Sequence, residues 1–294
     1  MILIVGATGN LGSAVAKSLL SEGKAVRAMT RTPEKAEALK KLGAEVVMGD
    51  VRDRQSLDKA CQGIEKIFAA SHSFEGKDQS SPQVVDGQGN RNLIDAAKAA
   101  GVKHFVFTSA LGARADHPVD FFRIKYQTEQ YLKDSGLSYT ILRPAAFMES
   151  WVEMIAQPML TTGKATIFGS GKNPVNYVAV VDVARFALIG LENPAAQNQV
   201  IEIGGPGNYT TEQIIKMIEQ TTGKTAKRSY TPIPVMKVMK VLSRPFRPVL
   251  SRMITAGINF DTTDQTFDMA ETLKQYPMPL TKLEDFVRER YGKA

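Results

Sequence analysis

The stretch Met1-Ile-Leu-Ile-Val-Gly-Ala-Thr-Gly-Asn-Leu-Gly12 places an apolar run directly before three glycines spaced three residues apart. The apolar residues predict a first strand at 2–5, and a helical pattern begins right after the second glycine. Backbone N–H groups at the positive end of a helix dipole suit a phosphate, so this turn predicts a dinucleotide site. Gly6 then permits the tight turn, Gly9 lets a pyrophosphate approach the backbone, and Gly12 lets the helix pack closely on the strand.

Short apolar runs alternate with segments of helical period along the first half of the chain. Neighbouring parallel strands need a connection of about a dozen residues or more, so this alternation predicts parallel strands joined by helices. Because the runs are nearly all apolar, both faces of the sheet are expected to be covered. The predicted fold class is α/β, with a doubly wound parallel sheet of the Rossmann type. The expected strands are 2–5, 25–30, 45–48, 66–70, 103–108 and 138–142, and the expected helices are 10–22, 33–42, 54–61, 85–100 and 121–134.

The alternation stops after Pro144, and the second half predicts a smaller mixed lobe. A helix is expected to begin near Asp182, a residue type that commonly caps helices. The predicted domains are a nucleotide-binding domain of residues 1–147, to which 175–203 return, and a substrate or partner lobe of residues 148–294. The other expected elements are strands at 175–181 and 200–203 and helices opening at 210–213 and spanning 234–257 and 283–290.

An arginine follows the expected second strand, in Thr30-Arg31-Thr32-Pro33. An acid at this place commonly binds the free ribose hydroxyl of NAD, whereas a guanidinium accepts a 2′-phosphate. NADP(H) is therefore favoured over NAD(H), with an ordinary exposed arginine as the alternative. Asp50 and Val51, after the third strand, are placed to reach the adenine. Asp50 also fits a plain loop acid, and Asp53 is better placed to cap the next helix.

Composition narrows the class of protein further. The chain has 294 residues, of which 43% are hydrophobic and 23% charged, enough for a substantial core. Its single cysteine, Cys61, cannot form an internal disulfide, so a reducing, cytoplasmic location is expected. No apolar run approaches the ~20 residues that a bilayer requires. The three histidines, His72, His104 and His117, lack the spacing of metal ligands, so no metal is expected.

Residues 220–260 contain eight lysines and arginines and no acid, while the whole chain has a net charge of +7. Such a run is most often a solvated rim, but an anionic partner is an alternative. Within it, Pro234 to Ser243 combines an apolar helix face with lysines three residues apart. A lid over the substrate is the preferred interpretation, and segment 224–252 as a surface for a membrane or a protein partner is the alternative. No nucleic-acid partner is expected.

Several motifs together resemble the NmrA-like branch of the atypical short-chain dehydrogenases/reductases. Within that branch the chain is similar to NADPH-dependent quinone and triphenylmethane reductases, to isoflavone-reductase-like enzymes, and to redox-sensing or assembly proteins. The motifs are GATGNLG at 6–12, MTRTPEKAEAL at 29–39, GD at 49–50, NLIDAAKAAGVKHFVFTSALG at 92–112, YLKDSGLSYTILRP at 131–144 and VAVVDVARFAL at 178–188.

The resemblance implies an NADP-binding Rossmann domain with a small lobe over the nicotinamide. It assigns the 2′-phosphate to Arg31 and the adenine side to Asp50 and Val51. It assigns phosphate contacts to Thr8, Gly9, Asn10 and Leu11, the middle of the cofactor to Ala70 and Ser71, and the nicotinamide pocket to residues from Pro144 to Phe147.

One position departs from the wider superfamily, which uses a tyrosine four residues before a lysine as proton donor. The lysine is Lys125, a candidate for both catalysis and cofactor binding, but Phe121 stands four residues before it. Tyr126 points about 100° away on a helix. The superfamily serine corresponds to Ser109, or to Ala110 if the motif is shifted by one residue.

Two functions fit a site without that tyrosine. The first is hydride transfer from NADPH to a small conjugated acceptor such as a quinone, with water or Lys125 supplying the proton. The second is a redox sensor or assembly factor that binds the nucleotide without turnover.

Overall fold

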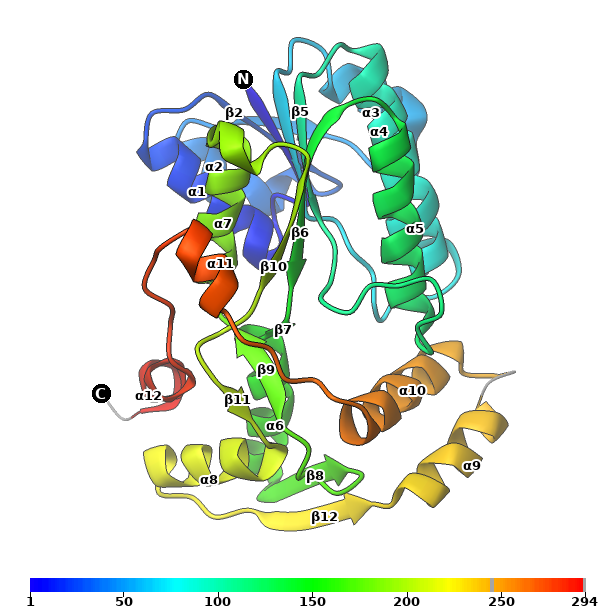
Figure 1. The fold of residues 1–294 in the computed structure, drawn as a ribbon, viewed down its shortest axis with the longest axis vertical. Coiled ribbons are helices and arrows are strands. Elements are labelled where there is room, and N and C mark those ends of the chain that lie inside the picture. Colours follow the sequence, from blue (N-terminus) through cyan, green and yellow to red (C-terminus); the bar gives the residue numbers. More distant parts are fainter. Residues whose placement is uncertain (244–245, 293–294) are drawn as a thin grey trace. The chain divides into compact units, whose positions relative to one another are not determined.

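The computed structural model describes residues 1–243 and 246–292, and the chain divides into two compact units (Figure 1). Unit 1 consists of residues 1–143 and 183–202, and unit 2 consists of residues 144–182 and those from 203 onward. The sequence predicted that 175–203 return to the first domain. In the structure residues 183–202 group with unit 1, whereas 175–182 group with unit 2.

Unit 1 is built on a seven-stranded sheet in the order β10-β6-β5-β4-β1-β2-β3. The chain moves outward from β1 to β2 and β3, and then crosses β1 to continue with β4, β5 and β6 on the other side. Neighbouring strands among β1 to β6 are all parallel, so the predicted doubly wound α/β sheet is confirmed. The strands are β1 (Ile2–Val5), β2 (Val26–Thr30), β3 (Glu45–Met48), β4 (Lys66–Ala69), β5 (His104–Thr108), β6 (Ser138–Pro144) and β10 (Gln199–Ile203).

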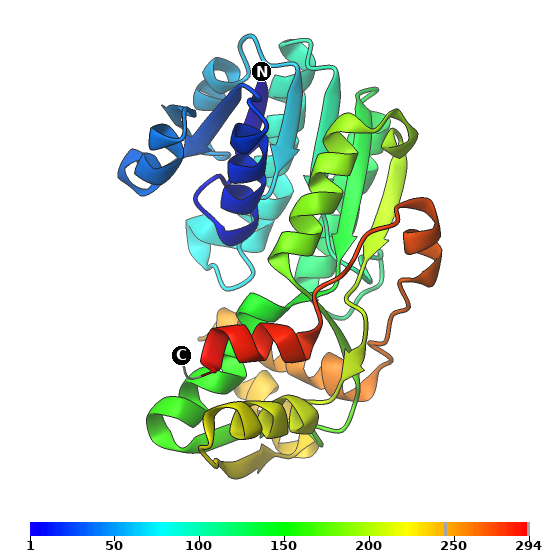
Figure 2. The same cartoon turned by 90° about the vertical axis from the view of Figure 1, so that its left-hand side faces the viewer.

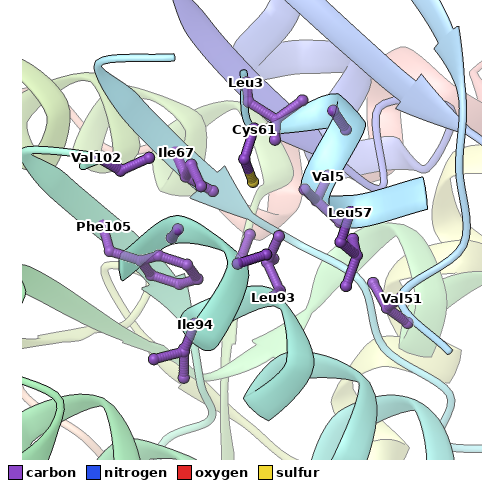
Figure 3. Packing of buried hydrophobic residues seen from close by; sticks show 14 of the residues in the cluster. Leu3, Val5, Val51, Leu57, Cys61, Ile67, Leu93, Ile94, Val102 and Phe105 are labelled. Carbon is purple, nitrogen blue, oxygen red and sulfur yellow. The ribbon is translucent and has the colours of Figure 1, made fainter. Parts of the chain in front are cut away.

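Helices cover both faces of this sheet, as its apolar strands require. Figure 1 shows α1, α2 and α7 on one face, toward which Figure 2 looks, and α3, α4 and α5 on the other. On the α3 to α5 side, Leu3 of β1, Leu57 of α3, Leu93 of α4 and Phe105 of β5 form one fully buried cluster (Figure 3). The helices are α1 (Asn10–Ser21), α2 (Glu37–Lys41), α3 (Arg54–Ala60), α4 (Asn90–Ala99), α5 (Asp120–Asp134) and α7 (Val180–Glu192).

The helix predicted at 85–100 begins instead as a seven-residue π-helix, Gln83–Gly89, before α4. A Cβ atom at Gly89 would lie 2.6 Å from Cγ2 of Val51, so glycine allows this turn to lie against the loop after β3. The wider π turn carries Asp86 into the protein interior, where it is fully buried. π-helical turns are rare and occur frequently at functional sites.

Unit 2 contains a three-stranded sheet in the order β11-β9-β7 and a parallel pair of β8 and β12. Its core includes Met148 and Met159 of α6, whereas Met154 of the same helix is exposed. The strands are β7 (Ala146–Phe147), β8 (Lys164–Phe168), β9 (Val175–Val178), β11 (Asn208–Tyr209) and β12 (Lys227–Thr231), and the helices are α6 (Met148–Thr162), α8 (Thr211–Thr222), α9 (Ile233–Ser243), α10 (Pro248–Thr262), α11 (Ala270–Gln275) and α12 (Leu283–Tyr291).

Two helix starts in the second half had different outcomes. The helix predicted to open at 210–213 is α8, whose N-cap Thr210 and Gln213 form a reciprocal capping box. The helix predicted to begin near Asp182 is α7, but it begins at Val180, so Asp182 lies within the helix and is not its N-cap. Asp182 is fully buried, and its carboxylate accepts hydrogen bonds from the backbone N–H and hydroxyl of Thr281 instead of capping the helix. Among the described helices, none has the length and apolar character to cross a membrane.

Candidate nucleotide-binding site

The glycine turn after β1 is packed backbone against backbone. Gly6 has a φ of +82°, in the region that favours glycine, and a Cβ there would lie 3.0 Å from the backbone nitrogen of Ser71. A Cβ at Gly12 would overlap the carbonyl oxygen of Gly6. The backbone nitrogen of Ala70 in turn donates to the carbonyl of Val5 (3.0 Å). The turn, the start of α1 and the end of β4 therefore meet at the carboxyl edge of the sheet.

The N-terminus of α1 carries no side-chain cap. Gly9 is the N-cap residue, and its extended backbone (φ −81°, ψ 166°) continues into a first turn that holds no acid. The first N–H groups of a helix have no partner within the helix, and their partial positive charge adds to the helix dipole. Thr8, Gly9 and Asn10 are exposed, whereas Leu11 is buried, so Leu11 offers only its backbone. This arrangement fits an anion such as a pyrophosphate.

Arg31 begins the loop after β2, next to the glycine turn. The hydroxyl oxygens of Thr8 and Thr30 lie 3.4 Å apart, and Thr30 also accepts from the backbone N–H of Thr32 (3.2 Å). These contacts fix the end of β2 beside the turn. Arg31 is exposed, and its guanidinium makes no ion pair with any residue in the described ranges.

Asp50 is paired with an arginine that the sequence reasoning did not single out. The Asp50 carboxylate accepts from Nε (3.0 Å) and Nη2 of Arg52, and Nη1 of Arg52 donates to the carbonyl of Gln79 (3.0 Å). Hydrogen bonding to Arg52 holds the pKa of Asp50 below its ordinary value, and the charge of Arg31 acts in the same direction. In the sequence, the position of Arg52 two residues after Asp50 could have indicated this pair. Asp53 caps α3 as predicted, accepting from the backbone N–H of Gln55 (3.0 Å).

Val51 and Ser71 line the same edge of the sheet. The Val51 side chain is 6% exposed because it packs against the π-helix, and its carbonyl accepts from Nδ2 of Asn92 (3.2 Å). The Ser71 hydroxyl lies 3.4 Å from Oδ1 of Asn90. Ser71 is half-buried, so it offers more surface to a ligand than Val51 does.

Lys125 lies on α5, in a second region of unit 1 that we call the Lys125 corner. Protein atoms surround its side chain there. Its side chain is 2% exposed, and Nζ lies 2.9 Å from Oδ1 of Asp86 and 2.9 Å from the carbonyl oxygen of Thr108. The ring centroids of Phe107 and Phe121 lie 5.0 and 5.5 Å from Nζ of Lys125. The buried ion pair leaves Lys125 neutralised by a carboxylate.

Asp86 is itself held by several neighbours. Its Oδ2 accepts from the backbone N–H of Ser73 (2.8 Å), and its carbonyl accepts from the Thr128 hydroxyl (3.0 Å) and from Nδ2 of Asn90 (3.1 Å). Nearby, His72 has its pKa lowered by desolvation and by the positive charge of Lys125. The pair could not be predicted from local sequence, because Asp86 and Lys125 lie on different helices.

The hydroxyl of Ser109 also has a hydrogen-bond partner within the protein. Its hydroxyl, 4% exposed, donates to Oε1 of Glu129, a fully buried carboxylate on α5. Arg143 donates to both oxygens of that carboxylate (2.9 and 2.6 Å) and forms an ion pair with Glu202 (3.2 Å). The Ser109 proton is therefore already used within unit 1.

The remaining predicted positions lie at the start of unit 2. Pro144 ends β6 and is buried, and Phe147 lies in β7 and is half-buried. Within the described ranges, no cluster of three or more histidine, cysteine, aspartate or glutamate side chains has a geometry that would hold a metal ion.

Residues 1–287 match the NmrA-like family. The chain belongs to that family. The resemblance drawn from the sequence motifs is therefore confirmed.

Named relatives of the chain include both an assembly factor and a reductase. The photosystem II assembly factor Ycf39 of Trieres chinensis is 31% identical over 297 residues, covering 99% of this chain and 92% of that protein. Quinone oxidoreductase 2 of Escherichia coli (strain K12) is 34% identical over 226 residues, covering 76% of this chain and 75% of that protein. The crystal structure of the NADPH-dependent quinone oxidoreductase QOR2 from Escherichia coli, complexed with NADPH, matches with a TM-score of 0.81 and 28% identity, covering 98% and 99% of the two chains.

Proposed function

We propose that this chain binds NADP(H) at the glycine turn of unit 1 and reduces a small conjugated acceptor such as a quinone. The observation that carries the proposal is the uncapped N-terminus of α1 beside the exposed guanidinium of Arg31, which has no ion-pair partner among the described residues. The helix end suits a pyrophosphate, and the guanidinium suits a 2′-phosphate. The complex of the related quinone oxidoreductase with NADPH supports this choice of cofactor.

Local charge supports NADP(H) over NAD(H). An acid after β2 or β3 would repel a 2′-phosphate, but the charge of Asp50 is balanced by Arg52. Arg31 then adds a positive charge that forms no ion pair within residues 1–243 and 246–292. We propose that the N–H groups from Thr8 to Leu11 hold the phosphates and that Arg31 holds the 2′-phosphate. Asp50, Val51, Ala70 and Ser71 are proposed to line the cofactor farther along the sheet edge, and Pro144 and Phe147 to line the nicotinamide pocket.

NADPH would supply a hydride, and the chain's own groups decide which acceptors suit it. Phe121 has no proton to give, Lys125 is paired with Asp86, and Ser109 donates to Glu129. An acceptor that needs a proton from the protein during reduction is therefore poorly served. A quinone spreads the arriving charge over its own conjugated system, so water supplies the proton afterwards and catalysis depends on placement. Lys125 is then proposed as a positioning residue that holds the ends of β5 and α5 together.

A second candidate is an NADP(H)-binding assembly factor without turnover. The match to the Ycf39 assembly factor spans 99% of this chain, whereas the match to the quinone oxidoreductase sequence spans 76%. The buried partners of Lys125 and Ser109 are compatible with this role as well, because both side chains are already bonded to carboxylates of unit 1.

Two measurements separate the candidates. Isothermal calorimetry with NADPH and with NADH tests the binding site, and NADPH is expected to bind more tightly. Stopped-flow oxidation of NADPH across a panel of quinones, dyes and enals tests turnover. Rapid oxidation that depends on one class of acceptor supports the reductase. Tight NADPH binding with no acceptor-dependent oxidation favours the second candidate, and no heat with either nucleotide contradicts both.

A further inference from the structure

Helix α9 carries an unusual number of exposed apolar side chains. It lies beside α10 in unit 2 (Figure 1), and Met236 is its one buried residue. A Cβ atom at Gly257 of α10 would lie 3.1 Å from Cε of Met236, so the two helices are in close contact there. Apolar residues scattered singly on a surface are ordinary, but a contiguous exposed group marks an interaction surface. The exposed apolar residues of α9 and the turn after it, here called the α9 face, are Val235 (49%), Val238 (59%), Met239 (41%), Val241 (70%), Leu242 (69%) and Phe246 (86%).

The spacing of these residues gathers them on one side of the helix. With 3.6 residues per turn, Val235, Val238, Met239 and Leu242 fall within an arc of roughly 100°. Phe246 follows the helix and is the most exposed large apolar side chain of the described residues. An aromatic ring in that position extends the α9 face beyond the end of the helix.

The charged side chains of α9 and of the turn after it are of one sign. Lys237 and Arg247 are exposed and Lys240 is half-buried, and none of the three forms an ion pair with a described residue. Arg228 is different, because Glu219 (2.6 Å) and Glu212 (3.6 Å) neutralise it. Among the described residues, Lys237, Lys240 and Arg247 are therefore basic groups without an ion-pair partner, in contrast to Arg228.

We infer that the α9 face docks on an anionic lipid bilayer surface. Helices that lie in a membrane interface combine an apolar side with lysines on the rest of their circumference. Residues 220–260 contain no acid, so no charge of the segment itself would repel anionic headgroups. Lysine stems can lie along the apolar side while their ammonium groups reach the headgroups. A second copy of the chain is disfavoured as the occupant, because it would present the same positive charge.

A fluorescent label on the full chain tests this inference directly. Val241→Cys introduces a thiol at a residue that is 70% exposed, and Met48→Cys, on β3 of unit 1, is the matched control at 74%. Cys61 does not compete for the label, because burial raises its pKa to about 12 and keeps its thiol protonated. Each variant is labelled with an environment-sensitive maleimide and mixed with vesicles of phosphatidylcholine, with or without phosphatidylglycerol.

The expected result is a blue shift of the Val241→Cys label with phosphatidylglycerol vesicles, weakened by added salt, and no shift of the Met48→Cys label. In co-sedimentation with the same vesicles, Leu242→Ser with Phe246→Ser should lower partitioning at least about tenfold, whereas Met48→Ser should leave it unchanged. Lys237→Glu with Lys240→Glu should also weaken it, compared with Lys98→Glu on α4.

Three results would overturn the inference. The first is no shift with either vesicle composition. The second is an equal shift of both labels, which would indicate nonspecific adsorption. The third is a blue shift that requires no lipid and rises with protein concentration, which would identify a second copy or another protein face as the occupant. Circular dichroism of each variant checks that the fold is kept.

Discussion

The glycine turn and the Lys125 corner both lie at carboxyl ends of parallel strands in unit 1, yet they differ in how their polar groups are satisfied. At the turn, no side chain caps the helix end, and Arg31 forms no ion pair with any residue that the structure describes. At the corner, Lys125 and Asp86 are buried and paired. Burying a charge is costly unless a partner compensates it, and an exposed unpaired charge costs little. The comparison teaches that the groups left free mark the binding site, whereas the paired groups mainly hold the strands and helices together.

The largest expected effect comes from disrupting the buried ion pair of Asp86 and Lys125. Asp86→Ala leaves the Lys125 ammonium buried without a carboxylate, which should lower the free energy of unfolding by about 3–5 kcal/mol. The double variant Asp86→Leu with Lys125→Met removes both charges and should recover most of that loss. Urea unfolding measures all three proteins. If Asp86→Ala were as stable as the parent chain, the buried pair would not have the structural role assigned to it.

The next effect concerns the close packing of the turn. Gly12→Ala introduces a Cβ that overlaps the carbonyl of Gly6, and the shift it forces should cost about 1–3 kcal/mol of unfolding free energy. Gly9→Ala is the matched control, because its Cβ would meet only the Gly6 oxygen at 3.4 Å, and it should cost less than about 1 kcal/mol. Thermal unfolding distinguishes them. Equal losses would contradict the separate tasks of the two glycines.

A smaller effect, on binding rather than stability, tests Arg31. Arg31→Ala removes the proposed partner of the 2′-phosphate and should weaken NADPH binding by about 1.5–3 kcal/mol while leaving NADH nearly unchanged. Lys35→Ala, an exposed cation in the same loop region, is the control and should alter neither. Calorimetry with both nucleotides gives the ratio of the affinity for NADPH to the affinity for NADH. An unchanged preference for NADPH would remove Arg31 from the site.

The smallest effect tests whether Arg52 balances Asp50. Arg52→Met should let the pKa of Asp50 rise toward its ordinary value and should weaken NADPH binding by about 0.5–1 kcal/mol, because a partly exposed pair is screened by water. Adding Asp50→Asn should restore the affinity, since it removes the carboxylate that repels the phosphate. If the double variant bound no better than Arg52→Met, the charge balance would not explain the preference.

Much of unit 1 was predictable from sequence because its signals are local. The strand at 2–5 and the strand at 45–48 have the predicted bounds. In unit 2, a local signal also worked, because the Thr210 capping box marks the start of α8. The π-helix at Gln83–Gly89 was not predicted, because it depends on Gly89 lying against Val51, far away in the chain. Asp182 was wrongly predicted as the N-cap of α7 for a similar reason, since its carboxylate bonds to Thr281 about a hundred residues away.

The sequence by itself determined the alternating fold, the glycine turn and the place of Arg31, because periodicity, missing side chains and chain neighbours are local properties. Only the tertiary structure decided which charges are free. Asp86 meets Lys125, Glu129 meets Arg143 and Arg228 meets Glu219 through folding that brings separate elements together. The sequence does not show which residue will pair with a given charge. Whether such a partner is present determines whether the charge stabilises the fold or remains available to a ligand.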